Sequence, residues 1–464
     1  MSGMMISTDG ETRKGSERTQ IEMFAQTISR LYNKQSFTPL QKILGKTLPA
    51  DMAQILDHFP EDDAAKIFYL IPASATAASV LKEVSVSLQN EILKDGEMQK
   101  IIPILEKMAP DARTDLFGHL DAELAQRLLE SLNKEAQKDV ENLLQYHPDT
   151  AGGLMTTQFF ALNEATTVQN AIESVRNLPT YEMVFYLYVV DGEGRLSGVS
   201  SLRQLLLAKP EYTLAQMMNR RVVKVRTSSP QDEVAEIARR YRLLAVPVVD
   251  EQGVLVGLVT VDDVIGVLEQ EVTDEVLKHA GTSSSEILAT SAFKIFRIRL
   301  PWLIAAFVGG LGASLVINSF ETTLSKVLAL GAFLPIILGM AGNVGNVAAT
   351  VAVRGLATGA VKLNQLLPLL LKELRVGLLL GGFYGVLLGV IAYVFYRDLA
   401  LSQTLVATIL LNMTMAAMLA ASLPLFFQRI GADPAVASGP FVLTAIDLLG
   451  VGTYFLVANA LYGL

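Results

Sequence analysis

The chain has 464 residues, with 38 Lys and Arg, 46 Asp and Glu, and no cysteine. Its length exceeds what one compact core usually organises, so we expect several domains. The lack of cysteine excludes disulfides, thiolate metal sites and cysteine nucleophiles. The net charge is −8 overall and +5 from Ala292 onward, which leaves −13 for the first 291 residues. This acidic half repels phosphate backbones, so nucleic acid is not an expected partner.

The N-terminal part predicts an all-α domain. Residues 1–24 are expected to be disordered, because the chain begins with polar, mixed-charge sequence and lacks the apolar core of a cleaved signal peptide. From 25 to 150, apolar residues recur at helical spacing, for example at Leu124, Leu128 and Leu132. This pattern indicates stacked short helices.

An internal repeat follows. The segment 184–191 predicts a strand, and a glycine-containing turn and a second strand come after it. The same pattern recurs at 244–250, and each copy ends in a helix. We therefore expect two α/β domains, 151–215 and 216–270, that form a pseudo-symmetric pair.

Both copies contain the string Val-Val-Asp-x-x-Gly-x-Leu-x-Gly. This string resembles the cystathionine-β-synthase (CBS) domain pair, a regulatory module that binds adenosine nucleotides or ions in many proteins. In that family a Thr-x-x-Asp pattern holds the ribose. Thr260 and Asp263 fit the pattern, whereas the first copy has Ser200 and Arg203. The resemblance implies ATP or another adenosine nucleotide at the second copy, and a CBS pair without ligand is the alternative.

An acidic connection, 271–297, leads from this pair to the apolar half of the chain. Around its start the sequence predicts a helix that carries Glu271, Asp274 and Glu275. A solvated linker helix is the plain alternative, because most charge runs only keep a helix in water.

From 298 to 464 the sequence predicts an all-α transmembrane domain with five helices in a lipid bilayer. Crossing a hydrocarbon core of ~30 Å takes ~20 helical residues. Five apolar runs are long enough: 300–319, 327–356, 366–396, 401–427 and 436–461. Lys and Arg flank the first run, the junction of the second and third, and the end of the fourth, which places these ends in the cytosol. The acidic half is then cytosolic, and the C-terminus lies outside the cell (inner) membrane.

The last run contains a lone carboxylate, Asp447, with apolar residues on both sides. An unpaired carboxylate at membrane depth costs several kcal/mol, so we expect it to face a water-filled cavity or a bound cation. A protonated Asp447 that makes a hydrogen bond between helices is the alternative.

The second run contains Pro335 and a stretch from Gly339 to Asn346 that is rich in glycine and asparagine. These residues predict an interrupted helix, in which free carbonyls such as that of Gly339 and the amide of Asn343 suit a hydrated hard cation. Close packing through small residues is the alternative. Since the runs contain oxygen ligands but neither His nor Cys, magnesium fits better than zinc or copper. A dimer would place two Asp447 carboxylates at one pore.

The order of these parts resembles the MgtE family of magnesium channels and transporters from about residue 25 to the end. The strings that carry the resemblance are Tyr146–Met155, Thr260–Val264, Gly342–Asn346 and Asp433–Pro440, followed by Asp447. The resemblance implies a homodimer with a pore on its two-fold axis and Asp447 as the central ligand of hydrated Mg²⁺.

The same resemblance implies regulation by cytosolic magnesium. The acidic helix would plug the pore when Mg²⁺ bridges its carboxylates to the cytosolic domains. The matching positions here are Asp232, Asp263, Glu271, Asp274 and Glu275.

The chain departs from the family pattern at several positions. It has Arg242 and Gly266 where members often have acidic sensor residues, and Ala341 and Val347 replace a Gly and a Gln of the pore string. Because fewer carboxylates remain to bridge, we expect magnesium-dependent gating to be weakened or altered.

Three other functions remain as alternatives. A secondary transporter could exchange a divalent cation for protons or sodium, with Asp447 as the titrating site. Apart from Asp447, only Glu373 is an acid deep in the last four runs, and it lies beside Lys372 and Arg375, so a channel is favoured. A membrane receptor that transports nothing would not need Asp447. An enzyme is least expected, because the chain lacks a P-loop, a nucleophile elbow and a metalloprotease His pair.

Overall fold

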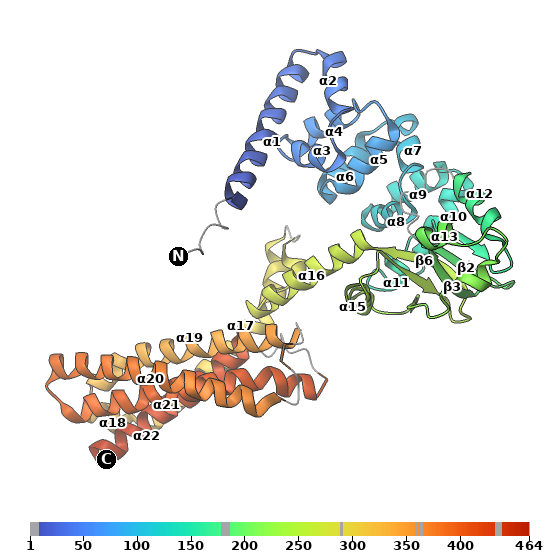
Figure 1. Cartoon of the computed structure of the whole chain (residues 1–464). Coiled ribbons are helices and arrows are strands. Elements are labelled where there is room, and N and C mark those ends of the chain that lie inside the picture. Colours follow the sequence, from blue (N-terminus) through green and yellow to red (C-terminus); the bar gives the residue numbers. More distant parts are fainter. Residues whose placement is uncertain are drawn as a thin grey trace, which may run out of the picture. The chain divides into compact units, whose positions relative to one another are not determined.

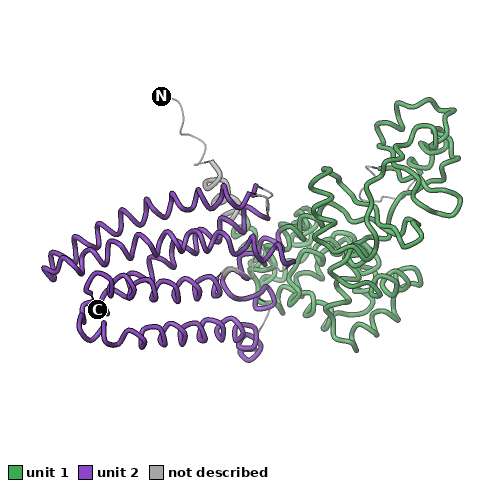
Figure 2. The backbone as a smooth tube through the Cα atoms, turned by 90° about the horizontal axis from the view of Figure 1, so that it is seen from below, with its two compact units in different colours: residues 1–268 green, residues 269–464 purple. Residues whose placement is uncertain are grey.

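The computed structural model describes residues 9–177, 186–287, 291–357, 360–361, 365–431 and 439–463. The chain forms two compact units, residues 1–268 and 269–464 (Figure 2). The first unit contains an all-α N domain and a pair of small α/β domains, and the second, called the membrane unit below, is all-α. The predicted multidomain fold class is confirmed.

The N domain consists of short helices around one apolar core (Figure 1). They are α1 (Asp9–Asn33), α2 (Phe37–Leu44), α3 (Pro49–Leu56), α4 (Glu61–Phe68), α5 (Ser74–Glu83), α6 (Val86–Asp95), α7 (Met98–Leu105), α8 (Pro110–His119), α9 (Ala122–Ser131) and α10 (Lys134–Leu143). Leu128 and Leu132 are buried as their spacing predicted. Helix α1 begins at Asp9, inside the segment 1–24 that was expected to be disordered, because its Glu, Arg, Lys and Gln residues favour helix even in polar sequence.

The two α/β domains have the same sheet topology. The first contains β1 (Ala161–Asn163), β2 (Tyr186–Val190), β3 (Leu196–Ser201) and helices α12 (Val168–Arg176), α13 (Leu202–Leu207) and α14 (Leu214–Met217). The short helix α11 (Ala151–Leu154) precedes them in the chain and packs into the core of the second domain. The second contains β4 (Val225–Arg226), α15 (Gln231–Tyr241), β5 (Ala245–Val249), β6 (Leu255–Thr260) and α16 (Val261–His279). In each sheet the middle strand pairs parallel with the first and antiparallel with the third. Val184 and Phe185 of the predicted first strand lie outside the described residues.

Reciprocal bonds join equivalent positions of the two copies. The Leu196 N–H donates to the Gly253 carbonyl and the Leu255 N–H donates to the Gly194 carbonyl, both at 3.1 Å. Gly194 and Gly253 have φ of 80° and 85°, a backbone region that favours glycine. The turn glycines of the repeat are therefore what allows the two sheets to meet in a symmetric way.

The acidic connection is shorter than predicted. Helix α16 ends at His279, a short 3₁₀ turn covers Ser284–Glu286, and the next helix begins only at Ala292, whereas a helix was expected over 271–297. Gly281 has φ of 80° and a run of Thr and Ser follows it. These side chains compete for backbone hydrogen bonds, so the helix stops there.

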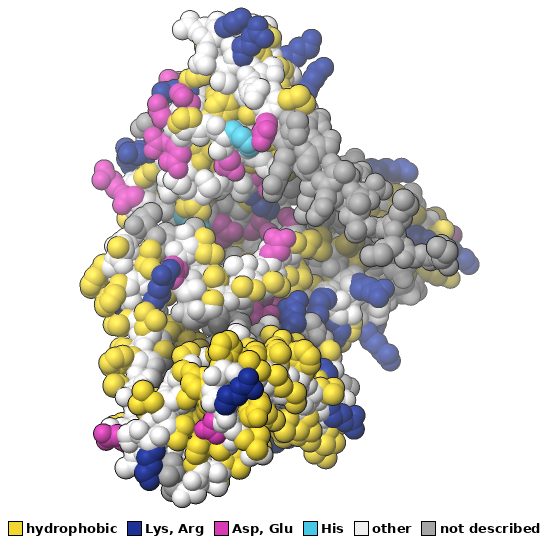
Figure 3. Space-filling model, turned by 90° about the vertical axis from the view of Figure 1, so that its left-hand side faces the viewer, with side chains coloured by type: hydrophobic (Ala, Val, Ile, Leu, Met, Phe, Trp, Pro, Cys, Tyr) yellow, Lys and Arg dark blue, Asp and Glu magenta, His cyan; other side chains and the backbone are white. Residues whose placement is uncertain are grey.

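The membrane unit has five helices long and apolar enough to cross a bilayer, as predicted. They are α17 (Ala292–Ser319), α19 (Ala329–Ala357), α20 (Leu366–Tyr396), α21 (Leu399–Arg429) and α22 (Pro440–Tyr462), with a short α18 (Glu321–Lys326) that the sequence did not predict. Residues 432–438, which include most of the string Asp433–Pro440 and the start of the fifth predicted run, lie outside the described residues. Hydrophobic side chains cover much of the visible surface of this unit (Figure 3), as a lipid environment requires.

The prediction of an interrupted second span is wrong, because α19 is continuous through Pro335 and the glycines. In a bilayer every free backbone group costs several kcal/mol, which outweighs the ~1 kcal/mol that each glycine costs a helix. Gly342 and Gly345 instead allow α19 to pack closely against Leu443 and Ile446 of α22. At Gly342 and Gly345 the structure therefore agrees with the alternative interpretation, close helix packing through small residues.

Glycines at a spacing of four residues bring α20 against α21. A Cβ on Gly377, Gly381 or Gly385 would lie 2.6 to 2.9 Å from backbone atoms of α21. Such distances are too short for real contacts, so any side chain here must push the two helices apart.

We predict that Gly381→Ala destabilises the membrane unit and that its neighbour Gly382→Ala does not. An alanine Cβ at position 381 would meet the Leu410 Cα at 2.8 Å, whereas one at position 382 meets no described atom within 4 Å. The expected cost at 381 is about 1–3 kcal/mol, seen as a lower melting temperature of the detergent-solubilised protein. Equal melting temperatures for the two variants would contradict this packing.

Candidate functional site

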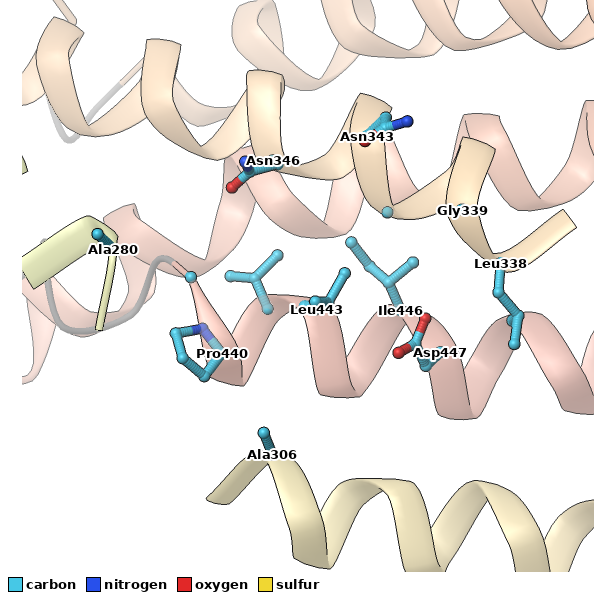
Figure 4. A pocket seen from close by; sticks show the side chains of 13 residues that line it. Ala280, Ala306, Leu338, Gly339, Asn343, Asn346, Pro440, Leu443, Ile446 and Asp447 are labelled. Atoms are coloured by element: carbon cyan, nitrogen blue, oxygen red, sulfur yellow. The ribbon is translucent and has the colours of Figure 1, made fainter. Parts of the chain in front are cut away.

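A cavity of about 550 Å³ lies between α19 and α22 of the membrane unit (Figure 4). Its wall on α19 runs from Leu338 to Asn346, and its wall on α22 runs from Pro440 to Asp447. Ala306 of α17 and Ala280, just after α16, complete the lining. We call it the Asp447 cavity.

Three residues that the sequence predicted as ion ligands meet in this cavity: Gly339, Asn343 and Asp447. Asn346, which belongs to the same sequence string, also lines it. Positions 339, 343 and 346 share one face of α19, because residues three and four apart are neighbours on a helix. The Asp447 carboxylate is directed toward the space between α22 and α19 (Figure 4).

The Asp447 carboxylate is half-buried and makes no hydrogen bond or ion pair with any described side chain. The alternative in which a protonated Asp447 bonds a neighbouring helix therefore lacks an acceptor among the described residues. Since a lone carboxylate at membrane depth is costly, a cation in the adjacent cavity would compensate its charge.

The α19 side of the cavity provides amide oxygens and open space. The side chains of Asn343 and Asn346 are exposed in the single chain. A Cβ on Gly339 would meet no described atom within 4 Å, so this glycine widens the cavity. Because α19 is continuous, the amide side chains are the more available oxygen donors on this wall.

A polar stripe on α19, formed by Asn343, Asn346, Thr350 and Arg354, leads from the cavity to one end of the helix. At that end the Arg354 Nη1 lies 2.9 Å from the Glu275 Oε2 of α16. One of the predicted sensor carboxylates is thus held by a cation of the chain itself.

The predicted sensor residues belong to both units: Asp232 and Asp263 lie in the first, and Glu271, Asp274 and Glu275 lie in the second. Among the described residues, no three His, Asp or Glu side chains are grouped to hold a metal ion. Asp232 is exposed at the first turn of α15, and Glu271, Asp274 and Glu275 are half-buried on α16.

Thr260 and Asp263, the predicted nucleotide ligands, do lie together. The Thr260 hydroxyl donates to the Asp263 Oδ2 at 2.5 Å. Burial, followed by the negative charge of Asp111, raises the pKa of Asp263 to about 6. In the first copy Ser200 is buried and its hydroxyl donates to the Ser201 carbonyl.

Sequence reasoning missed Asn412 of α21, which supports α22 from behind the cavity. Its side chain is 3% exposed, and its Nδ2 donates to the Gly450 carbonyl at 3.0 Å. Its Oδ1 has no hydrogen-bond partner in the described part of the chain. A second cavity of about 10 Å³ beside Asn412, Ile446 and Gly450 has room for about one water. An amide in the middle of an apolar run was the signal that could have revealed it.

We predict that Asn412→Leu lowers cation transport without lowering stability. The substitution removes the bond that orients α22 one turn after Asp447, but it also removes a buried acceptor without a partner, which costs about 1–3 kcal/mol. Transport into liposomes should therefore fall while the melting temperature stays unchanged. A parallel loss of both would mean that Asn412 only holds the fold together.

Family comparisons match nearly the whole chain. A family described as a divalent cation transporter, MgtE, matches residues 334–457, and the MgtE intracellular N domain matches 47–149. CBS domains match residues 151–211 and 214–270.

Individual relatives agree with these matches. The magnesium transporter MgtE of Thermus thermophilus is 35% identical over 446 residues, which cover 95% of this chain and 99% of the relative. The magnesium transporter MgtE of Bacillus subtilis is 31% identical over 422 residues, which cover 90% of this chain and 93% of the relative. Among solved structures, the cytosolic domain of the Mg²⁺ channel MgtE in complex with ATP is similar, with a TM-score of 0.51 and 37% identity, covering 52% of this chain and 99% of that one.

Proposed function

Since the chain belongs to the MgtE family of divalent cation transporters, we propose that it conducts Mg²⁺ through a pore built around Asp447. The observation that carries the proposal is the meeting of Asp447 and Asn343 in one cavity between two spans. The relatives are transporters, so no enzymatic activity is assigned to the chain.

The size and chemistry of the cavity suit a hydrated ion. Magnesium loses its waters reluctantly and usually keeps several when bound. Six waters occupy ~180 Å³, which fits within the cavity of about 550 Å³. Asp447 and the two asparagines would then hold the ion through its waters, and Gly339 would keep the space open.

Charge balance favours a homodimer. One Asp447 per chain compensates half of the charge of Mg²⁺, and a second copy would supply the other half at the same pore. The polar side chains of Asn343 and Asn346, exposed in the single chain, would face this shared pore instead of lipid.

The orientation follows from the basic residues at the helix ends. Arg299, Arg354, Lys372 and Arg429 lie at the ends of spans that the positive-inside rule places in the cytosol. The N domain and CBS pair would then be cytosolic in the cell membrane, and the C-terminus would lie outside.

The channel reading is favoured over coupled exchange by the scarcity of buried acids. Glu373 is buried, but its Oε1 lies 4.0 Å from the Lys372 Nζ near a helix end. This leaves Asp447 as the one acid at depth among the described spans, and proton coupling usually requires a relay of such groups.

Regulation would act through α16 and the CBS pair. Mg²⁺ would bind among Asp232, Asp263, Glu271, Asp274 and Glu275 and stabilise a closed state, with weakened effect because Arg242 and Gly266 supply no carboxylate. A relative's cytosolic domain has been solved with ATP, which supports an adenosine nucleotide at Thr260 and Asp263.

The test of the pore is Mg²⁺ uptake into liposomes under an imposed membrane potential, without a proton or sodium gradient. We expect wild-type uptake, a loss of at least about tenfold in Asp447→Ala, and an intermediate rate in Asp447→Asn. The asparagine amide can still hydrogen-bond the hydration shell of the ion, but the negative charge is gone. Each tenfold loss of uptake rate corresponds to about 1.4 kcal/mol.

Two outcomes would contradict the pore. Uptake that requires an opposing proton or sodium gradient would indicate an exchanger. Undiminished uptake in Asp447→Ala would exclude Asp447 from the pathway.

The test of gating is the Glu275–Arg354 pair. If this pair holds α16 in the closed state, Glu275→Lys should raise Mg²⁺ uptake at high internal Mg²⁺. The double variant Glu275→Lys with Arg354→Glu swaps the two charges and should return uptake to the wild-type level. A partly exposed pair is worth ~0.2–1 kcal/mol, so the increase should be at most about fivefold. Additive effects of the two substitutions would mean that the pair has no role in closure.

A further inference from the structure

One ammonium group lies among four carboxylates where the N domain meets the second CBS copy. The Lys82 Nζ of α5 is 3.2 Å from the Asp262 Oδ2 and 3.9 Å from the Asp263 Oδ1, both in the first turn of α16. Asp111 and Asp115, one turn apart on α8, complete the group. We call these five residues the Lys82 cluster.

The carboxylates of α8 are under-compensated, and that of Asp111 is also buried. Asp111 is 7% exposed, and its Oδ1 has no hydrogen-bond partner among the described residues. Partial desolvation, then the negative charge of Asp111, raises the pKa of Asp115 to about 6. His119 and Lys82 are the positive groups that oppose this shift.

Lys82 is the cation that offsets the repulsion among the carboxylates of α8 and α16. Burial disfavours its charge most strongly, yet Asp263, Asp262 and Asp111 together hold the pKa of Lys82 above its usual value. Its side chain is 38% exposed, so the ammonium is partly withdrawn from water into the contact. Without it, like charges on α8 and α16 would face each other across two domains.

We propose that Lys82 is a built-in cation that docks the N domain on the second CBS copy without bound magnesium. A free divalent cation is the chemical class that could otherwise bring these carboxylates together, because it prefers carboxylate oxygens and neutralises two charges. The chain supplies one of those charges itself.

The docking bears on regulation because of where the partners lie. Asp262 and Asp263 begin α16, and the same continuous helix carries Glu275 near its end. If Lys82 fixes the first turn of α16 at all magnesium concentrations, Mg²⁺ binding has a smaller effect on the position of this helix. This consequence rests on the proposed transport function, whereas the docking does not.

The docking can be measured as a distance in the full-length protein. The chain has no cysteine, so spin labels can be placed at Asp51→Cys in the N domain and Arg239→Cys in the second CBS copy, both exposed positions. Pulsed dipolar spectroscopy of the protein in detergent, with chelator or with excess Mg²⁺, gives the distance distribution. The variants are Lys82→Met, which keeps the stem and removes the charge, and Lys82→Arg, which retains it.

With labelled chains diluted by co-expressed unlabelled chain, so that pairs between the two copies of the proposed homodimer do not contribute, we expect one narrow distance in the wild type under both conditions. Lys82→Met should lose that narrow distance in chelator and regain it with Mg²⁺, and Lys82→Arg should behave as the wild type. Lys66→Met is the matched control, because Lys66 is an exposed N-domain lysine that pairs only within α4, with Asp62 at 2.6 Å.

A narrow distance for Lys82→Met in chelator, or a broad one for the wild type, would overturn the proposal. Asp262→Asn provides a second test should Lys82→Met fold poorly: it removes the closest partner at an exposed position and should broaden the distance in chelator. An unchanged distance in that variant would also count against the docking.

Transport distinguishes this proposal from the proposed function. If both are right, the ratio of Mg²⁺ uptake at low and high internal Mg²⁺ should rise in Lys82→Met by about fivefold or more, the lower range of allosteric couplings. The expected distances without any Mg²⁺ transport would leave the docking standing and remove the proposed function. Mg²⁺ transport together with an unchanged distance in Lys82→Met would support the proposed function and remove the docking.

Discussion

The membrane unit depends on one uncompensated negative charge. Asp447 stands at membrane depth, half-buried, without an ion pair or hydrogen bond among the described residues. The chain could remove this cost with a lysine or arginine on a facing helix, but the described part of the cavity wall contains small, apolar and amide residues instead. The free energy that is not recovered inside the protein would then be available to bind the ion of the proposed pore.

The packing around Asp447 leaves open space beside its carboxylate. Gly309 and Gly312 of α17 accept Thr444 and Leu448, and Gly345 of α19 accepts Ile446, so α22 is held closely on both sides. Gly339 has no such neighbour within 4 Å among the described residues. Similar residues thus perform opposite tasks: some glycines close the helix contacts, and one leaves the cavity open.

The carboxylates of α16 differ from Asp447 because they have positive partners. Glu275 is paired with Arg354, and Asp262 and Asp263 lie beside Lys82. These pairs are partly exposed, so each contributes little stability by itself. Their importance lies in their positions, because Asp262 and Asp263 are in the first turn of α16 and Glu275 is near its end.

The sequence by itself determined the local features. Apolar runs of sufficient length predicted five spans, the repeated strand patterns predicted the α/β pair, and a carboxylate without a nearby base marked Asp447. Such features depend on residues close together in the chain, where periodicity and composition decide the outcome.

The tertiary structure decided what depends on distant neighbours. Gly342 and Gly345 of α19 pack against Leu443 and Ile446 instead of loosening the helix. Asn412 mattered only once Gly450 lay opposite, and Lys82 met Asp262 across 180 residues. No local pattern carries these pairings, because whether a glycine loosens or packs a helix, and whether a charge is solvated or paired, depends on the group that folding brings to face it.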